Sequence, residues 1–261
     1  MRIIFVRHGE PDYTDDSLTE KGKREADLLS KRTKDWNIKD IYVSPLGRAK
    51  ETAEPTAKAL DIEPVVLPWL REYSYMVVNP IHGEKSVPWD FTPTQVFENQ
   101  EMISKDGWTK AGPNISNSEV HDNYAAVLNG LDELIEKYGY KRIENHYIRK
   151  DGRERFIRST VKDMKLCTAD ELPENDSEPT ILVVCHFGVI CLMLSHLLNI
   201  PFELLTHGFI LPTSSVTIVN TEERWKDEVS FRVQAMGDCT HLIKENEPIS
   251  NAGSFARLFQ Q

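Results

Sequence analysis

The sequence is poor in cysteine and has no closely spaced cysteine pair. Its 261 residues include four cysteines, Cys167, Cys185, Cys191 and Cys239, and no CxxC motif. Disulfide frameworks and thiolate metal sites usually rely on such spacings, so the pattern argues against both. Cys185 and Cys191 lie in an apolar stretch, where we expect buried free thiols. Reduced thiols fit a cytoplasmic protein.

Basic residues are also fewer than acidic ones. Lysine and arginine number 31 against 41 acidic residues, which gives a net charge of −10. Nucleic-acid binding needs a broad basic face, so we expect no nucleic-acid partner. An anionic ligand must instead find a local concentration of positive charge. No pair of histidines has HExxH or similar spacing, so we expect neither a metal nor another cofactor.

Long hydrophobic runs are nearly absent. One run, residues 181–198, is long enough to raise the question of a membrane span. His186 and Gly188 interrupt it, and we interpret it as a buried strand, a turn and a helix. The apolar N-terminal segment, residues 3–6, is too short for the core of a signal peptide. We therefore expect a soluble protein that does not interact with membranes.

Strand-like and helix-like segments alternate along the chain. Helices are predicted from Thr19 onward, after Ser44-Pro45, and over 120–138 and 188–198. Strands are predicted at 2–6, 38–43, 64–66, 180–185, 215–220 and 231–235. This alternation predicts a single α/β domain over residues 1–261. We expect a three-layer sandwich with a mostly parallel central sheet and helices on both faces.

Two stretches depart from this alternation. Residues 140–157 alternate apolar with charged residues around Lys150-Asp151-Gly152, which predicts a β-hairpin with a glycine turn. Residues 69–124 are irregular and rich in aromatic residues, unlike a linker. We place a cap-like insertion at about 73–165. Its aromatic side chains either line the substrate pocket or form the core of the insertion: Tyr73, Tyr75, Trp89, Phe91 and Trp108.

Two histidines directly follow predicted strands. His8 comes after the first strand with Arg7 beside it, and His186 comes after the strand in the later apolar run. Active sites of such sheets gather at the carboxyl ends of the strands. Imidazole is a nucleophile near neutral pH, and arginine binds phosphate oxygens in pairs. Arg48 adds a second arginine at a helix N-terminus, which favours an anion. These residues indicate phosphoryl transfer.

Four short motifs occur in a fixed order. They are Arg7-His8-Gly9, Leu18-Thr19-Glu20-Lys21-Gly22, a run from Ser44 through Arg48 to Thr52-Ala53, and His186-Phe187-Gly188. Together they resemble the histidine phosphatase superfamily, in its phosphoglycerate-mutase-like branch. The resemblance covers the two ends of the chain, residues 2–70 and 180–219. It implies an α/β enzyme that transfers phosphoryl groups through a phosphohistidine.

The resemblance assigns roles to particular residues. His8 is then the nucleophile, and Arg7, Arg48 and His186 hold the phosphate, with His186 also counted as catalytic. The branch assignment follows from Phe187, because the other branch of the superfamily has an aspartate directly after the second histidine.

The resemblance also implies an acidic residue that protonates the leaving oxygen. The family carries it in a Leu-x-Glu setting after the third strand, and Leu70-Arg71-Glu72 matches that pattern. Glu72 is therefore the predicted proton donor. Glu84 and Asp90 are the alternatives if Glu72 is only a surface carboxylate.

The sequence departs from the family pattern in three places. Thr14 replaces an asparagine, so a hydroxyl is predicted to make that phosphate contact. Phe187 replaces a glycine beside the second histidine, which places a bulky ring at the phosphate. The loop between Glu10 and Leu18 is short and lacks the Gly-Trp pair of the mutases. This last departure favours a phosphatase over a mutase.

The main hypothesis is a metal-independent phosphatase that acts on a small phosphorylated metabolite. Two alternatives stay open. One is a phosphoglycerate-mutase-type phosphoryl transferase, and the other is a non-catalytic protein that binds a phosphorylated ligand. The sequence leaves the oligomeric state open, with a homodimer among the possibilities.

Overall fold

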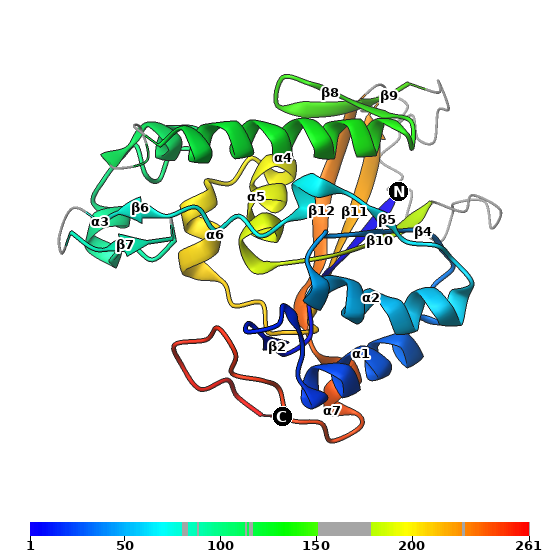
Figure 1. The fold of residues 1–261 in the computed structure, drawn as a ribbon. Helices are drawn as coiled ribbons and strands as arrows, with labels where there is room; N and C mark the ends of the chain where they lie inside the picture. Colours follow the sequence, from blue (N-terminus) through cyan, green and yellow to red (C-terminus); the bar gives the residue numbers. More distant parts are fainter. Residues whose placement is uncertain are drawn as a thin grey trace.

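The described part of the chain is built around an eight-stranded sheet (Figure 1). The computed structural model describes residues 1–79, 83–87, 89–112, 114, 117–150, 179–225 and 228–260. In sheet order the strands are β5 (Val65–Val66), β4 (Ile38–Val43), β10 (Thr180–Cys185), β1 (Arg2–Arg7), β11 (Val216–Trp225), β12 (Glu228–Asp238), β9 (His146–Arg149) and β8 (Tyr140–Ile143).

The sheet divides into a parallel and an antiparallel half. β5, β4, β10 and β1 pair in parallel, whereas β11, β12, β9 and β8 continue the sheet in antiparallel pairs. The α/β class and the parallel core are therefore confirmed. β10 is buried along its whole length, as expected for a parallel strand covered on both faces.

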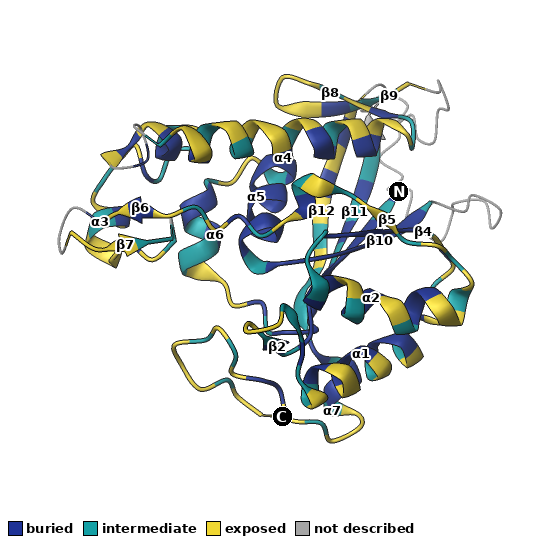
Figure 2. Ribbon diagram, in the orientation of Figure 1, coloured by how far each residue is buried: buried dark blue, intermediate teal, exposed yellow. Residues whose placement is uncertain are grey.

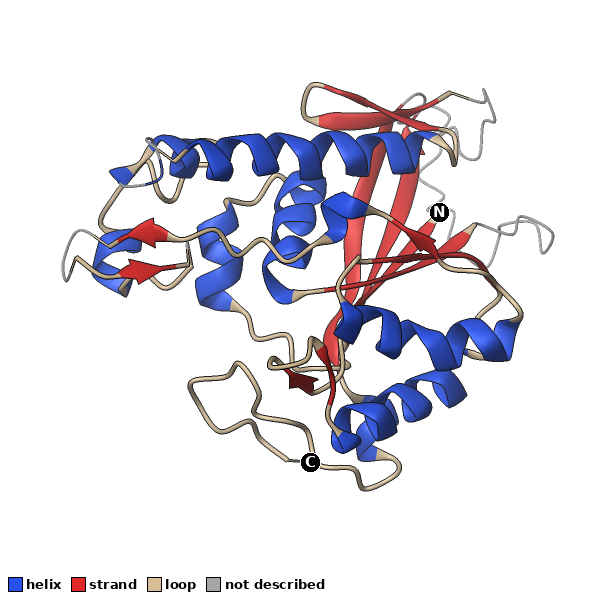
Figure 3. Ribbon diagram, viewed as in Figure 1, coloured by secondary structure: helices blue, strands red, loops and turns tan. Residues whose placement is uncertain are grey.

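Helices cover both faces of this sheet (Figure 3). Thr19 caps the first of them, because its side chain accepts a hydrogen bond from the backbone N–H of Gly22, as the sequence predicts. The helices are α1 (Glu20–Thr33), α2 (Gly47–Leu60), α3 (Pro93–Phe97), α4 (Ser118–Glu136), α5 (Phe187–Leu198), α6 (Phe202–Gly208) and α7 (Thr240–Ile243), with short 3₁₀ turns η1 (Pro68–Leu70) and η2 (Gly107–Lys110).

Successive side chains of β1 enter two separate cores, because neighbours along a strand point to opposite faces. Ile4 and Val6 belong to the apolar cluster that includes residues of α1 and α2. Ile3 and Phe5 belong to the cluster on the other face, which includes residues of α4, α5 and α6. Figure 2 shows the buried residues of these helices. The predicted three-layer sandwich is confirmed.

The β8–β9 hairpin corrects one prediction. Its strands pair Ile143 with His146, so the chain turns at Glu144-Asn145, a turn that the sequence did not predict. Glu144 has φ +52°, a left-handed conformation that usually favours glycine or asparagine. A glutamate in that position gives no turn signal in the sequence, which explains the error. Residues 151–157 of the predicted hairpin lie outside the described residues.

The aromatic side chains of the insertion are mainly buried in the core on one face of the sheet. Tyr73, Phe91 and Trp108 are at most 4% exposed and belong to the cluster with α4 and α5. Tyr75 and Trp89 are half-buried against the same cluster. A short hairpin completes this part of the chain, formed by β6 (Val77–Val78) and β7 (Lys85–Ser86). The predicted end of the insertion, near 165, lies outside the described residues.

The apolar run at 181–198 forms a strand, a turn and a helix, as predicted. Cys185 and Cys191 within it are buried free thiols. Cys167 lies outside the described residues. His196, near the end of α5, contacts the carboxylate of Asp132 at 3.0 Å. Among the described residues, no helix is long and apolar enough to cross a membrane.

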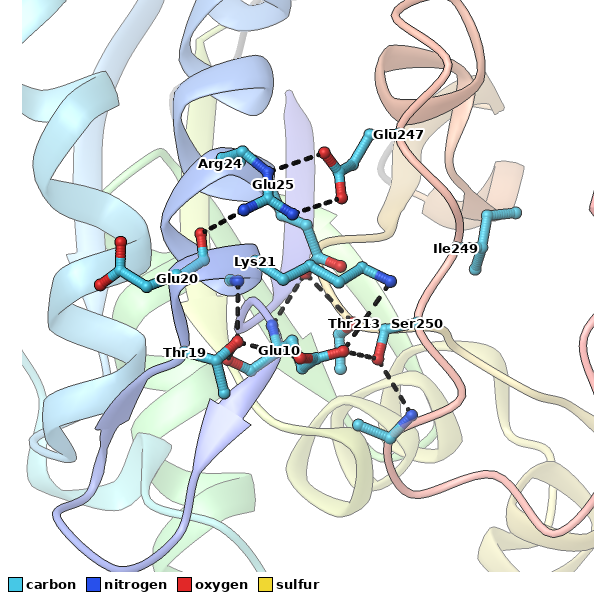
Figure 4. Close-up of polar contacts among 12 residues, drawn as sticks. Glu10, Thr19, Glu20, Lys21, Arg24, Glu25, Thr213, Glu247, Ile249 and Ser250 are labelled. Atoms are coloured by element: carbon cyan, nitrogen blue, oxygen red, sulfur yellow. Dashed lines mark hydrogen bonds and ion pairs between the residues drawn. The ribbon is translucent and has the colours of Figure 1, made fainter.

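The segment after α7 packs against the loop that follows β1 (Figure 4). Ser250 donates a hydrogen bond to Glu10 Oε2 at 2.6 Å, and Arg24 pairs with Glu247 at 2.9 Å. From the other side, Glu25 accepts a hydrogen bond from the backbone N–H of Glu10 at 2.8 Å. The loop directly after His8 is therefore fixed by α1 and by a segment more than 200 residues away.

Gly22 allows α1 to approach this loop. A Cβ atom at Gly22 would lie 2.2 Å from the backbone oxygen of Glu10. We expect Gly22→Ala to lower the free energy of unfolding by about 1–3 kcal/mol through overpacking, measured by urea denaturation. Gly208→Ala is the control, because a Cβ there meets nothing within 4 Å. Equal stability of the two variants would contradict the close approach.

Candidate active site

Three neighbouring parallel strands end at the same edge of the sheet, and their next residues meet there. The backbone N–H of His8, after β1, donates to Cys185 O at 2.9 Å. The N–H of Ser44, after β4, donates to Val184 O at 3.0 Å. His186 follows β10 between them, and its ring centroid lies 5.0 Å from that of His8. Two histidines 178 positions apart are thus brought together, as predicted.

The hydrogen bonding of His8 fixes its tautomer. Nδ1 lies 2.8 Å from the carbonyl oxygen of Gly9. Because a carbonyl oxygen can only accept, Nδ1 carries the proton. Burial, together with the positive charges of Arg7 and Arg48, lowers the pKa of His8 to about 3. At neutral pH the ring is therefore uncharged, and Nε2 holds a free lone pair.

Ser44 organises the second imidazole. Its Oγ lies 2.7 Å from His186 Nε2 and accepts a hydrogen bond from the N–H of Leu46 at 3.3 Å. The hydroxyl can donate to His186 Nε2, and in that tautomer the ring proton is on Nδ1. Burial lowers the pKa of His186, and the neighbouring His8 and the arginines lower it further. In the tautomer in which Ser44 donates to Nε2, His186 is a neutral donor through Nδ1.

Two buried arginines stand beside the imidazoles. Arg7 donates to the carbonyl oxygens of Leu211 at 2.7 Å and Ala252 at 3.4 Å. Arg48 lies in the first turn of α2 and pairs with the carboxylate of Asp16. Burial lowers the pKa of Arg7, and the charge of Glu72 opposes that shift. Positive charge is therefore concentrated locally in an acidic chain.

Three nitrogens of this cluster are buried without a hydrogen-bond partner among the described residues. They are Arg7 Nε, Arg48 Nε and His186 Nδ1. A buried donor left unpaired costs about 1–3 kcal/mol. Three such donors in one cluster, two of them cationic, suit an anion with several oxygens. Phosphate has that chemistry.

Glu72 lies at the N-terminus of α5, beside this cluster. Its Oε1 accepts three backbone N–H bonds, from Tyr73 at 2.9 Å, Gly188 at 3.0 Å and Val189 at 3.3 Å. Burial of the carboxyl raises its pKa, while the charge of Arg7 opposes the shift. Because Oε1 is occupied as an acceptor, a proton on this carboxyl resides on Oε2.

The two alternative acids do not lie at this cluster. Glu84 is exposed in the turn of the β6–β7 hairpin, and Asp90 is exposed near His207. Of the three carboxylates considered from the sequence, Glu72 is the one that the structure brings to the histidines.

The remaining predicted phosphate contacts differ in their placement. Phe187 opens α5, and its ring lies 5.9 Å from the Arg7 guanidinium carbon. Trp89 packs edge-on against Phe187 at 6.3 Å. Thr14 is exposed in the turn that joins two short strands, β2 (Pro11–Asp12) and β3 (Ser17–Leu18). The structure does not bring Thr14 into the cluster, and its phosphate contact stays a prediction.

Three contacts of the site were not predicted from the sequence. The sequence predicts only that a helix starts after Ser44-Pro45. The position of Ser44 directly after a buried strand could have indicated that it lies at the site. Asp16 is one of several acidic residues in a loop, and nothing local distinguishes it from its neighbours. The carbonyl of Ala252 has no sequence signal at all.

Comparison with protein families gives an independent result. A sequence model described as the histidine phosphatase superfamily (branch 1) matches residues 3–139 and 160–233. A probable phosphoglycerate mutase of Photorhabdus laumondii is 37% identical over 81 residues, 28% of this chain and 38% of the relative. Its counterpart in Yersinia enterocolitica is 33% identical over 145 residues, 51% of this chain and 64% of the relative. These matches span less than two thirds of either relative.

Solved structures share the fold across most of the chain. A phosphoserine phosphatase of Entamoeba histolytica with bound phosphoserine aligns with a TM-score of 0.53 at 18% identity, covering 92% of this chain and 98% of its own. A mycobacterial glucosyl-3-phosphoglycerate phosphatase with bound VO3 aligns with a TM-score of 0.53 at 16% identity, covering 90% and 97%. At these identities the likeness establishes the fold alone.

The lowered pKa of His8 predicts acid sensitivity. The unfolded chain binds a proton below about pH 6.5, whereas folded His8 resists protonation down to about 3. The stability contribution is therefore complete above pH 6.5 and is lost as the pH falls towards 3. We expect His8→Asn, whose amide can still donate to Gly9 O, to lose less unfolding free energy than the wild type between pH 6.5 and 4.5. Urea denaturation measures this, and the exposed His146→Asn should keep the wild-type dependence.

Proposed function

The chain belongs to the histidine phosphatase superfamily, branch 1, and on that premise we propose that it is a metal-independent phosphatase acting on a small phosphorylated metabolite. In this proposal His8 carries the phosphoryl group as a phosphohistidine. The observation that supports it most is the state of His8 Nε2, an unprotonated nitrogen in a cluster where three buried nitrogens have no hydrogen-bond partner among the described residues. A nucleophile and an oxyanion cradle are the two parts that phosphoryl transfer requires.

The first step forms the phosphohistidine. His8 Nε2 attacks phosphorus, and the bond from phosphorus to the ester oxygen breaks. Arg7, Arg48 and His186 donate to the non-bridging oxygens, whose charge must be stabilised in the transition state. The leaving oxygen takes the proton from Glu72 Oε2, so an alcohol departs and Glu72 becomes a carboxylate. The raised pKa of Glu72 favours the protonated form that this step needs.

The second step returns the enzyme to its starting state. Water attacks phosphorus, and the phosphorus–nitrogen bond breaks. Glu72, now the base, takes one proton from the water, while inorganic phosphate leaves and His8 Nε2 regains its lone pair. The Nδ1–H bond to Gly9 holds the imidazole in one tautomer through both steps.

A mutase is the second candidate, and the relatives named as probable phosphoglycerate mutases favour it. A mutase returns the phosphoryl group to another substrate oxygen rather than to water. The short loop between Glu10 and Leu18, without a Gly-Trp pair, supports the phosphatase instead. Release of free phosphate from a generic aryl phosphate distinguishes the two. A non-catalytic phospho-ligand-binding protein is less well supported, because Glu72 is bonded to the start of α5, two residues after His186, and is close enough to Arg7 and Arg48 for their charges to act on it.

The proposal also covers the setting in which the protein acts. We also propose that the protein is cytoplasmic, that its partner is a small phosphorylated metabolite, and that it binds no nucleic acid. A homodimer is the candidate assembly.

His8→Ala tests the nucleophile. We expect it to reduce hydrolysis of an aryl phosphate by roughly 10⁴-fold or more, and to abolish acid-labile labelling of the protein by a radioactive phosphate ester. Phosphate release and acid-quench labelling measure the two effects. Activity that survives this substitution would show that another group attacks phosphorus.

Glu72→Gln tests the proton donor through the leaving group. An amide keeps the size of the side chain and its acceptor oxygen but cannot supply the proton. We expect kcat/KM on an alkyl phosphate, which reports formation of the phosphohistidine and not its hydrolysis, to fall by about 10²- to 10⁴-fold. The loss should be much smaller on a nitrophenyl phosphate, whose leaving oxygen needs little protonation. Equal losses on both substrates would rule out Glu72 as the general acid.

A further inference from the structure

The carboxylate of Asp16 pairs directly with Arg48, one of the proposed phosphate-binding residues. Its Oδ1 accepts from Arg48 Nη1, and its Oδ2 accepts from the backbone N–H of Gly47 at 2.7 Å. Both carboxylate oxygens are thus held by the first residues of α2. The side chain of Asp16 nevertheless stays 41% exposed, against 11% for Arg48. Its outer side is therefore open to solvent.

The loop that carries Asp16 is fixed by its backbone. Asp16 has φ +51°, and a Cβ at Gly47 would lie 2.1 Å from its carbonyl oxygen. Glu51 accepts a hydrogen bond from the N–H of Leu18 at 2.8 Å, which ties the end of the loop to α2. Tyr13 lies over the Arg48 guanidinium at 5.4 Å. The position of the carboxylate is therefore set by the fold rather than by one ion pair.

Arg48 links this carboxylate to the reaction centre. The charge of Arg48 contributes to the lowered pKa of both His8 and His186, and its Nε lacks a partner among the described residues. Asp16 occupies one donor of a guanidinium that has five. Arg48 can thus bind a phosphate oxygen while Asp16 remains attached beside it.

We propose that Asp16 is a specificity-determining residue that selects against a second negative charge near the phosphate of the substrate. A fixed carboxylate at the edge of the site repels a substrate carboxylate and accepts hydrogen bonds from hydroxyl or ammonium groups. The favoured substrates are phosphomonoesters of uncharged or amino alcohols rather than of hydroxy acids. This inference rests on the proposed phosphatase function and specifies its substrate class.

A matched pair of ligands isolates this effect. Glycerol 3-phosphate and 3-phosphoglycerate differ in a hydroxymethyl against a carboxylate. Binding is measured by calorimetry in the His8→Ala background, which does not consume the ligands, so the result does not depend on hydrolysis. Arg71 lies close enough to the site for its charge to lower the pKa of His186. The preference of the parent protein for one ligand over the other therefore reflects both Arg71 and Asp16. The change in that preference when Asp16 is substituted measures the contribution of Asp16.

We expect Asp16→Asn to shift the ratio of the two dissociation constants about tenfold in favour of the carboxylate. Asparagine tolerates the left-handed backbone at this position, and Asp16→Gly is a second variant that also does so. Asp15→Asn, in the same exposed turn, makes the same change in net charge and should leave the ratio as in the parent.

Each outcome decides between two explanations. An unchanged ratio with equally tighter binding of both ligands shows that Asp16 merely competes for Arg48, and it overturns the inference. So does the same shift in the Asp15→Asn control, or failure of glycerol 3-phosphate to bind the parent. Phosphate release by the protein with native His8 is scored separately. Its absence, with the binding shift intact, refutes the phosphatase proposal and leaves the role of Asp16 in place.

Discussion

The parallel pairing of β4, β10 and β1 is the constraint on which the site depends. The ladder continues one residue beyond the strands, through the N–H of Ser44 to Val184 and the N–H of His8 to Cys185. The residues that follow the three strands therefore emerge side by side at one edge. A change of register by one residue would turn each side chain to the opposite face. The chemistry of the site is thus an outcome of sheet geometry as much as of residue identity.

Burial governs the electrostatics at that edge. The chain carries a net charge of −10, yet two arginines and two imidazoles converge with few counter-charges. Desolvation and the nearby cations keep the imidazoles neutral, which suits His8 to attack and His186 to donate. The same desolvation acts in the opposite direction on Glu72 and favours its acid form. One environment thereby prepares a base-like nitrogen and a proton donor within the same cluster.

Much of this arrangement could be read from the sequence, because the signals are local. A buried strand followed by a histidine places His8 and His186, whereas Glu72 came from the resemblance to the family, through its Leu-x-Glu pattern. Contacts that depend on distant segments gave no such signal. The carbonyl of Ala252 and the carboxylate of Asp16 acquire their roles only from the way loops meet. The turn at Glu144-Asn145 was not predicted because the left-handed backbone of Glu144 is unusual for a glutamate.

The partners of Arg7 have a consequence for how the protein is made. This arginine lies 204 and 245 positions before the two carbonyl groups that hold its guanidinium. During translation it leaves the ribosome long before either group exists, beside a histidine that still lacks its neighbouring strand β10. Contacts between such distant segments form late and slowly. The cluster around Arg7 and His8 should consequently be completed only after residues 211–252 have been synthesised.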